Sequence, residues 1–200
     1  MAARVDRDSP RYFRTPTPGG PNATSDVIGF AEEPAFSIGR GFCEQPFAVE
    51  LTTATPGVRV RYTTDASTPS PSHGTLYAGP IPIATTTVLR ALACREDLEP
   101  SRVVTHTYLF LNDVAVQGNA PPGYPSAWGS VPADYGMVPT ASLYAKAAGN
   151  AAFTPGQARA AVAASLRSLP SLCLSTDQAN LFDPATGLYL NPTGRGETWE

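Results

Sequence analysis

The chain has 200 residues, including 17 glycines and 21 prolines, and 42% of its residues are hydrophobic. This composition excludes coiled coils and long helical bundles, because glycine and proline interrupt helices, and it predicts a turn-rich globular protein. The formal net charge of −3 gives no basic surface for nucleic acid. No apolar run is long enough to cross a bilayer, and no apolar signal-peptide segment follows Met1, so we expect neither a membrane span nor a secretion signal within this chain.

Residues 1–33 are predicted to be an extended linker. The stretch 15–22 reads Thr-Pro-Thr-Pro-Gly-Gly-Pro-Asn, and so many prolines and glycines prevent a regular helix or strand there.

Residues 34–111 are predicted to be a small Greek-key β-sandwich, which makes the chain mainly β. Hydrophobic and polar residues alternate along 47–52 and again along 58–63, the period of half-buried strands. Thr55-Pro56-Gly57 lies between these runs and favours a turn, so we expect the two strands to form an antiparallel hairpin. Further strands are expected near Tyr77, over 86–94 and over 103–111, and prolines confine the Pro80–Ile83 stretch to a sheet edge or a kinked strand.

Residues 112–153 are predicted to be an irregular connector, in which aromatic rings lie among prolines and glycines. From Thr154 a helix is expected, because Thr154 and Gln157 form a capping box and Pro155 suits the first helical position. Its apolar face comprises Ala158, Val162, Leu166 and Leu169, and Pro170 ends it.

A short strand over 172–175, a helical turn over 177–182 and a turn at Gly187 are expected to follow. Together with the helix they give a short α+β segment over 154–200, which has too little core to stand alone. We therefore interpret it as the incomplete start of a further domain.

Candidate catalytic groups are few. The two histidines, His73 and His106, lie in a predicted loop and a predicted strand, which favours structural roles over a metal site or a catalytic pair. Asp177 and Asp183 flank a short turn and could face one cleft, but an N-cap role and a turn role account for them. Neither Gly-x-Ser-x-Gly nor a phosphate-binding loop occurs, and the one lysine, Lys146, lies in the connector. We predict no catalytic, cofactor-binding or metal site.

Two alternatives stay open. Cys43, Cys94 and Cys173 match no zinc or redox motif and are interpreted as small semi-buried hydrophobes, with a Cys43–Cys94 disulfide as the alternative. Asp65 is interpreted as part of an Asx-type turn with Ser67, with an oxygen-ligand calcium site as the alternative.

Exposed aromatic residues are the remaining candidates for ligand binding. Tyr124, Trp128 and Tyr135 lie among breakers, where a ring could stack on a sugar. The alternative is that these rings fill the junction between the sandwich and the C-terminal segment.

A series of motifs at fixed spacings runs through residues 36–91. They are Phe36-Ser37, Pro46-Phe47, Val58-Arg59-Val60-Arg61-Tyr62-Thr63-Thr64-Asp65, Ser67-x-Pro69, Gly74-x-x-Tyr77, Pro80-Ile81 and Thr86-x-x-Leu89-Arg90-Ala91. The series resembles the fibronectin-III-like C-terminal domain of chitobiases and β-hexosaminidases, which implies a seven-stranded immunoglobulin-like or fibronectin-III-like sandwich. It departs at Ala66, where that family has glycine. If this position requires a positive φ, alanine costs about 1 kcal/mol there, unless the turn has shifted.

The flanks resemble parts of other families. Residues 15–22 resemble the closing segment of bacterial lamin-tail domains, which makes 1–33 the end of an upstream domain. Residues 169–200, with Asn180-Leu181-Phe182-Asp183 and Trp199-Glu200, resemble the opening segment of the spore-coat-protein-H (CotH) kinase family, and 128–137 are similar to the preceding connector, although Val138 replaces its usual acidic residue. That family's catalytic residues lie beyond this segment, so none is carried onto this chain.

Two functional hypotheses follow. The first is a non-catalytic sandwich that acts as a spacer or interaction module in a multidomain bacterial secreted or surface protein. Its expected partners are neighbouring domains of the parent chain and polysaccharide or other cell-surface components. The alternative is an N-terminal fragment of a CotH-type protein kinase, inactive without its downstream core.

Overall fold

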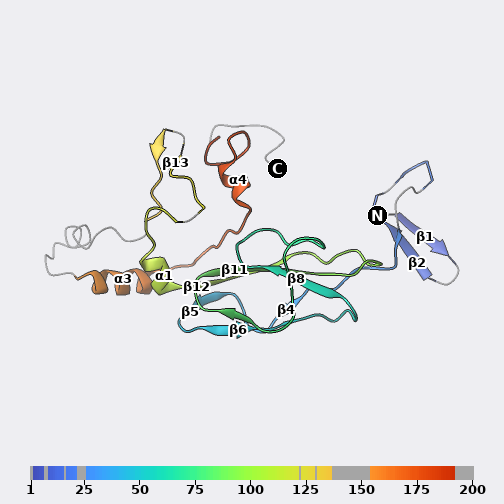
Figure 1. Cartoon of the computed structure of the whole chain (residues 1–200), viewed down its shortest axis with the longest axis horizontal. Coiled ribbons are helices and arrows are strands. Elements are labelled where there is room, and N and C mark those ends of the chain that lie inside the picture. The colour runs from blue at the N-terminus through green and yellow to red at the C-terminus, as the bar shows by residue number, and fades with distance from the viewer. Residues whose placement is uncertain are drawn as a thin grey trace. The chain divides into compact units, whose positions relative to one another are not determined.

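The computed structural model describes residues 2–6, 9–15, 17–21, 26–121, 123–128, 130–136 and 154–191 (Figure 1). The chain divides into two compact units, one with residues 1–40, 47–83 and 88–106 and the other with residues 41–46, 84–87 and 107–200. Of the predicted features, Lys146, residues 137–153 of the connector and the stretch 192–200 lie outside the described residues. In the described part, no helix is long and apolar enough to cross a membrane.

The structure is mainly β, as predicted. The strands are β1 (Ala2–Asp6), β2 (Ser9–Phe13), β3 (Asp26–Val27), β4 (Ala35–Phe36), β5 (Gly41–Cys43), β6 (Phe47–Val49), β7 (Leu51–Thr52), β8 (Arg59–Thr63), β9 (Thr75–Leu76), β10 (Ile81–Ile83), β11 (Thr87–Cys94), β12 (Val104–Phe110), β13 (Ala127–Trp128) and β14 (Val131–Pro132). The helices are α1 (Leu111–Ala115), α3 (Pro155–Ser168) and α4 (Gln178–Phe182).

The sheets are consistent with a β-sandwich. One sheet has five strands in the order β5-β12-β11-β8-β9, and two-stranded sheets pair β10 with β6 and β4 with β7. The predicted alternation is confirmed in part: Val49, Leu51 and Val60 are buried, whereas Tyr62 is half-buried and Thr63, predicted to face outward, is buried. Leu89 and Ala91 on β11 are also buried. Apolar side chains from the large and the small sheets therefore form the core of the first unit, and their burial is the main favourable term in its folding.

The Thr55–Gly57 turn joins strands of different sheets, so the predicted hairpin is wrong. Gly57 has the positive φ (+69°) that the turn requires. However, β7 pairs with β4, in the register Phe36↔Leu51, whereas β8 pairs with β9 and β11. A Pro-Gly turn can close a hairpin or carry the chain across to another sheet, and the long-range partners of the strands decide between the two.

The prediction of an edge position for the proline-rich strand is confirmed. Pro82 lies on β10, opposite Ala48 of β6, in a sheet of two strands. Ile81 and Ile83 on either side of Pro82 are buried. Because a two-stranded sheet has only edge strands, proline's missing N–H interrupts no central ladder.

Side chains of the neighbouring strands hold the loop between β8 and β9. The Arg61 Nη1 donates to the Gly74 carbonyl (2.7 Å), the Arg90 Nη1 donates to the Ala66 carbonyl (2.8 Å), and the Thr63 hydroxyl donates to the Ser67 carbonyl (2.6 Å). Ala66 has a φ of +66°, the one positive value at a non-glycine residue in the described part of the chain. The departure from the family's glycine therefore carries the predicted strain of about 1 kcal/mol.

The predictions of an extended linker over 1–33 and of an irregular connector over 112–153 both need correction. The expected linker 1–33 contains an antiparallel hairpin of β1 and β2, with β3 added beside β2, although 14–15 and 17–21 form no strand. The connector contains the helical turn α1, which follows β12 directly, and the β13–β14 pair. The sequences of β1 and β2 do not alternate strictly between apolar and polar residues, and β3, α1, β13 and β14 are too short to show a clear period.

The capping box that begins α3 is confirmed. The Gln157 N–H donates to the Thr154 hydroxyl (3.3 Å) and the Thr154 N–H donates to the Gln157 side-chain oxygen (2.8 Å). Ala158 and Val162 are buried as predicted, whereas Leu169 is the C-cap residue and is 64% exposed. The predicted apolar face is therefore one turn too long.

The predicted strand over 172–175 is wrong. The segment belongs to no strand, and Leu172 and Leu174 are largely exposed. Leu172, Cys173 and Leu174 form a short apolar run, but the segment pairs with no strand among the described residues.

Candidate functional site

The structure brings the three predicted aromatic candidates together. The Tyr124 and Tyr135 ring centroids lie 5.3 Å apart and those of Trp128 and Tyr135 lie 5.5 Å apart, both pairs in edge-to-face contact. Two further rings join them: Tyr189 stacks on Trp128 with a centroid distance of 5.5 Å, and Phe182 stacks on Tyr189 at 5.6 Å. We call these five rings the aromatic cluster.

Polar contacts fix the centre of the aromatic cluster. The Trp128 Nε1–H donates to the Tyr135 hydroxyl (3.0 Å), which in turn donates to the Pro125 carbonyl (3.0 Å). Trp128 and Tyr135 are half-buried, whereas Tyr124 is 45% and Tyr189 50% exposed. The rings thus face one another and attach the segment 124–135 to the segment 182–189, which is the arrangement expected of a structural joint.

A shallow hollow of about 590 Å³ lies beside Tyr124 and Phe182, and Asp183 also lines it. The Asp183 carboxylate accepts from the N–H groups of Ala185 (2.8 Å) and Thr186 (2.9 Å). These backbone hydrogen bonds stabilise the charged form and lower the pKa of Asp183. The turn role predicted for Asp183 is confirmed.

Asp177 occupies the backbone N-cap position of α4, as predicted, but its side chain makes no capping hydrogen bond. It does not line the hollow beside Tyr124 and Asp183. The Asp177 and Asp183 carboxylates therefore do not face one cleft.

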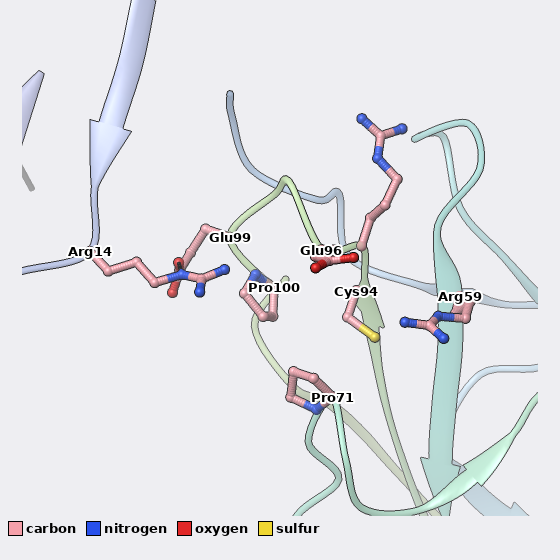
Figure 2. A pocket seen from close by; sticks show the side chains of 8 residues that line it. Arg14, Arg59, Pro71, Cys94, Glu96, Glu99 and Pro100 are labelled. Carbon is pink, nitrogen blue, oxygen red and sulfur yellow. Dashed lines mark hydrogen bonds and ion pairs between the residues drawn. The ribbon is translucent and has the colours of Figure 1, made fainter. Parts of the chain in front are cut away.

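A second cavity, of about 410 Å³, lies in the first unit at one end of the β8–β11 ladder (Figure 2). We call it the ladder-end pocket. Arg59 is the first residue of β8 and Cys94 the last residue of β11, and the two are direct cross-strand partners. The remaining lining comes from Arg14, Pro71, Arg95, Glu96, Glu99 and Pro100.

Most charges around the ladder-end pocket are paired. The Arg14 Nε donates to the Glu99 carboxylate (2.8 Å). Arg95 donates through Nε to Asp97 (2.6 Å) and through Nη1 to the Pro56 carbonyl (2.8 Å). The hydrogen bonds from Arg95 lower the pKa of Asp97.

Arg59 and Glu96 are the exceptions. Among the described residues, neither side chain makes a hydrogen bond or ion pair. Figure 2 shows the Arg59 guanidinium extending toward Cys94, with Pro71 and Pro100 beyond it. One cation, one anion and an apolar wall are thus available in the same pocket.

Both histidines have structural contacts. The His106 ring stacks on Phe36 (4.2 Å between centroids) and its Nδ1 lies 3.2 Å from the Ile38 carbonyl oxygen. Burial lowers the pKa of His106 because it penalises the imidazolium. The His73 Nε2 lies 3.2 Å from the Ser67 hydroxyl.

The predicted Asx-type turn at Asp65 is confirmed. The Ser67 N–H (3.1 Å) and hydroxyl (2.6 Å) both donate to Asp65 Oδ1, and the hydroxyl bond is the main cause of the lowered pKa of Asp65. The part of the chain that the structure describes contains no group of three or more His, Cys, Asp or Glu side chains that could hold a metal ion.

The cysteines are free thiols with different environments. Cys94 is buried, Cys43 is half-buried, and Cys173 is exposed, so the predicted burial is wrong for Cys173. Burial raises the pKa of the Cys43 thiol.

Sequence reasoning missed the ladder-end pocket. Arg59 occupies a polar position of an alternating strand, which predicts a solvated side chain, and the loop after β11 has no motif. Only the pairing of β8 with β11 places Arg59 opposite Cys94, and that register is not visible in either strand alone.

These features define a small β-sandwich with a cavity at the end of its β8–β11 ladder. Residues 39–105 match the family model of the chitobiase/beta-hexosaminidase C-terminal domain. The match spans β5 to the beginning of β12 and includes every lining residue of the ladder-end pocket except Arg14. No curated protein matches the chain.

Proposed function

We propose that the sandwich is a non-catalytic module that spaces neighbouring domains and contacts polysaccharide in a multidomain bacterial secreted or surface protein. The observation that carries the proposal is the match of residues 39–105 to a domain family that is named after carbohydrate-cleaving enzymes, the chitobiases and β-hexosaminidases. A non-catalytic role agrees with the site chemistry, because Asp65, His73 and His106 of the sandwich make contacts that hold turns and loops.

The aromatic cluster, in this proposal, holds the connector and the C-terminal segment together. One face of the Trp128 ring stacks on Tyr189, and its N–H donates to the Tyr135 hydroxyl. Little of the Trp128 side chain is therefore left to contact a sugar. Phe182 lies between Tyr124 and Tyr189 in the same way.

Co-sedimentation of the whole chain with chitin, cellulose and purified cell-wall polysaccharide tests the proposal. We expect retention on at least one of these, and we expect Trp128→Ala to be retained equally well. Retention on none would leave a spacer without a carbohydrate partner, and selective loss in Trp128→Ala would make the aromatic cluster the binding surface.

The same preparation is expected to release no product from a chromogenic N-acetylglucosaminide and to transfer no phosphate from ATP. Turnover that persists at constant specific activity through further purification would contradict the non-catalytic role.

A second candidate function is the opening segment of a CotH-type kinase, supported by the resemblance of residues 169–200. The segment 177–191 carries its own hydrogen bonds, including Leu188 N–H to the Asn180 carbonyl (3.0 Å) and Tyr189 N–H to the Leu181 carbonyl (2.8 Å). The test is the DNA that follows the codon of Glu200. An open frame into a kinase core with acidic and Asn residues supports this candidate, and a stop codon there overturns it.

A further inference from the structure

The ladder-end pocket has the size and the location of a small-molecule site. Its volume of about 410 Å³ lies within the range of typical ligand pockets. Its floor is the paired end of β8 and β11, and its rim is the loop that follows β11. Loops held on a rigid ladder are the usual place for binding residues.

The charges of the pocket oppose an ionic ligand. Arg14 is neutralised by Glu99, and Arg95 by Asp97, so that Arg59 and Glu96 remain as one cation and one anion. A small anion attracted to Arg59 would be repelled by Glu96. A small cation attracted to Glu96 would be repelled by Arg59. The pocket therefore favours a neutral molecule that offers both donors and acceptors.

Sugar hydroxyl groups meet this requirement. A hydroxyl donates to a carboxylate and accepts from a guanidinium, so one ring with several hydroxyls can satisfy Glu96 and Arg59 at once. Pro71, Pro100 and the buried Cys94 side chain give the pocket an apolar wall. The C–H face of a pyranose ring fits such a wall.

We propose that the ladder-end pocket binds one neutral pyranose unit of a glycan, with Arg59 donating to and Glu96 accepting from its hydroxyls. This inference rests on the proposed carbohydrate role and names the site and the class of sugar. It places the contact on the sandwich and not on the aromatic cluster.

The test is a titration of the ¹⁵N-labelled chain, followed by amide chemical shifts, with cellobiose and chitobiose and with glucuronate and glucosamine as charged counterparts. A neutral sugar is expected to shift the amides of Cys94, Arg95, Glu96 and Glu99 in the millimolar range, and the charged sugars are expected to bind more weakly. Tighter binding of glucuronate, or shifts confined to Tyr124 and Tyr189, would overturn the proposal, as would the absence of any shift in the lining amides.

Two variants separate the roles of the charged groups. Arg59→Met and Glu96→Gln are each expected to weaken the binding about tenfold, because each removes hydrogen bonds to a charged group. Arg102→Met and Glu33→Gln change exposed charges outside the lining and are expected to bind like the unaltered chain. Unchanged affinity in both pocket variants, with thermal unfolding also unchanged, contradicts the proposal.

Failure of this inference differs from failure of the proposed function. If Arg59→Met and Glu96→Gln still sediment with a polysaccharide that retains the unaltered chain, the carbohydrate role stands and the pocket is wrong. If the unaltered chain sediments with none but its pocket amides shift with soluble sugar, the pocket stands and the polysaccharide contact is wrong.

Discussion

Two irregular segments of this protein contain the same local features, an aspartate turn and a tightly packed glycine, but differ in the contacts that stabilise them. The loop 65–74 and the turn segment 177–191 each contain an aspartate that accepts from an N–H two residues ahead, Asp65 from Ser67 and Asp183 from Ala185. Each also contains a glycine that leaves no room for a Cβ atom. An added Cβ on Gly74 would lie 2.8 Å from the Tyr62 carbonyl oxygen, and one on Gly187 would lie 2.7 Å from the Asp183 carbonyl oxygen.

The partners of the two segments are different. Side chains of β8 and β11, namely Arg61 and Arg90, donate to carbonyl groups of the loop. The turn segment is held by its own backbone and by the Asn191 amide, which donates to the carbonyls of Pro184 and Gly187 (both 3.2 Å). Its rings Phe182 and Tyr189 also pack in the aromatic cluster, on Tyr124 and Trp128 of the connector. We infer that the loop unfolds with the sandwich, whereas the turn segment opens locally.

The largest expected effect is that of Gly74→Ala. Gly74 has a φ of +99°, so alanine adds backbone strain to the close contact with Tyr62. The two costs together predict a loss of about 3 kcal/mol in the free energy of unfolding of the sandwich. Urea unfolding followed by circular dichroism measures it. The control is Gly79→Ala, which has open space around the new Cβ, and an equal loss there would contradict the explanation.

Gly187→Ala tests the other side of the comparison. The clash with Asp183 is expected to cost about 2 kcal/mol, but only in the turn segment. Amide hydrogen exchange should show lost protection at Leu188 and Tyr189, with unchanged exchange in β8 and β11. Gly118→Ala, which meets nothing within 4 Å, is the matched control. Unfolding of the sandwich along with the turn would show that the two regions are coupled.

Ala66→Gly is expected to stabilise the protein. Position 66 has a φ of +66°, which glycine adopts without steric cost. The free energy of unfolding should rise by about 1 kcal/mol. For a domain of the size of the sandwich, this is equivalent to a rise of roughly 4–8 °C in Tm. Ala78→Gly is the control, because Ala78 does not have a positive φ, and that variant should be slightly less stable. A gain in both variants would rule out relief of strain as the cause.

The smallest effect is the dependence on pH. The pKa values of Asp65 and Asp183 are lowered in the folded protein. The unfolded chain therefore binds protons first, so each carboxylate contributes stability above the ordinary aspartate pKa of about 3.9, and this is lost as pH falls through the folded value. Carboxyl ¹³C shifts should titrate below that ordinary value at both residues. Asp65→Asn should remove the acid sensitivity of the loop but not that of the turn segment, and a loss at both sites would contradict the comparison.

Local signals in the sequence predicted local structure well. The burial of Val49 on β6 and Val60 on β8 and the capping box of Thr154 depend on residues within a few positions of one another. The positive φ of Ala66 is instead one of two possibilities raised by the glycine that the resembling family has at this position. The family resemblance predicted the sandwich, and the match over 39–105 agrees with it.

Features that depend on distant partners could not be predicted. The runs 58–63 and 172–175 were both predicted to be strands, yet among the described residues only the first pairs with other strands. The Trp128–Tyr189 stack and the Arg59–Cys94 pairing likewise join residues far apart in the chain. Their positions follow from the register and packing of whole elements, which composition and periodicity do not specify.

The change of sheet at Gly57 has a consequence for how the protein folds. Because β7 and β8 share no ladder, the tight turn between them yields no early hairpin, and β8 must find β11 across a long stretch of chain. Contacts of such high sequence separation slow folding, so we expect refolding in milliseconds to seconds. Opening the chain at the Pro56–Gly57 bond in a circular permutant would break no strand pair, and the ladders of the sandwich should form as before.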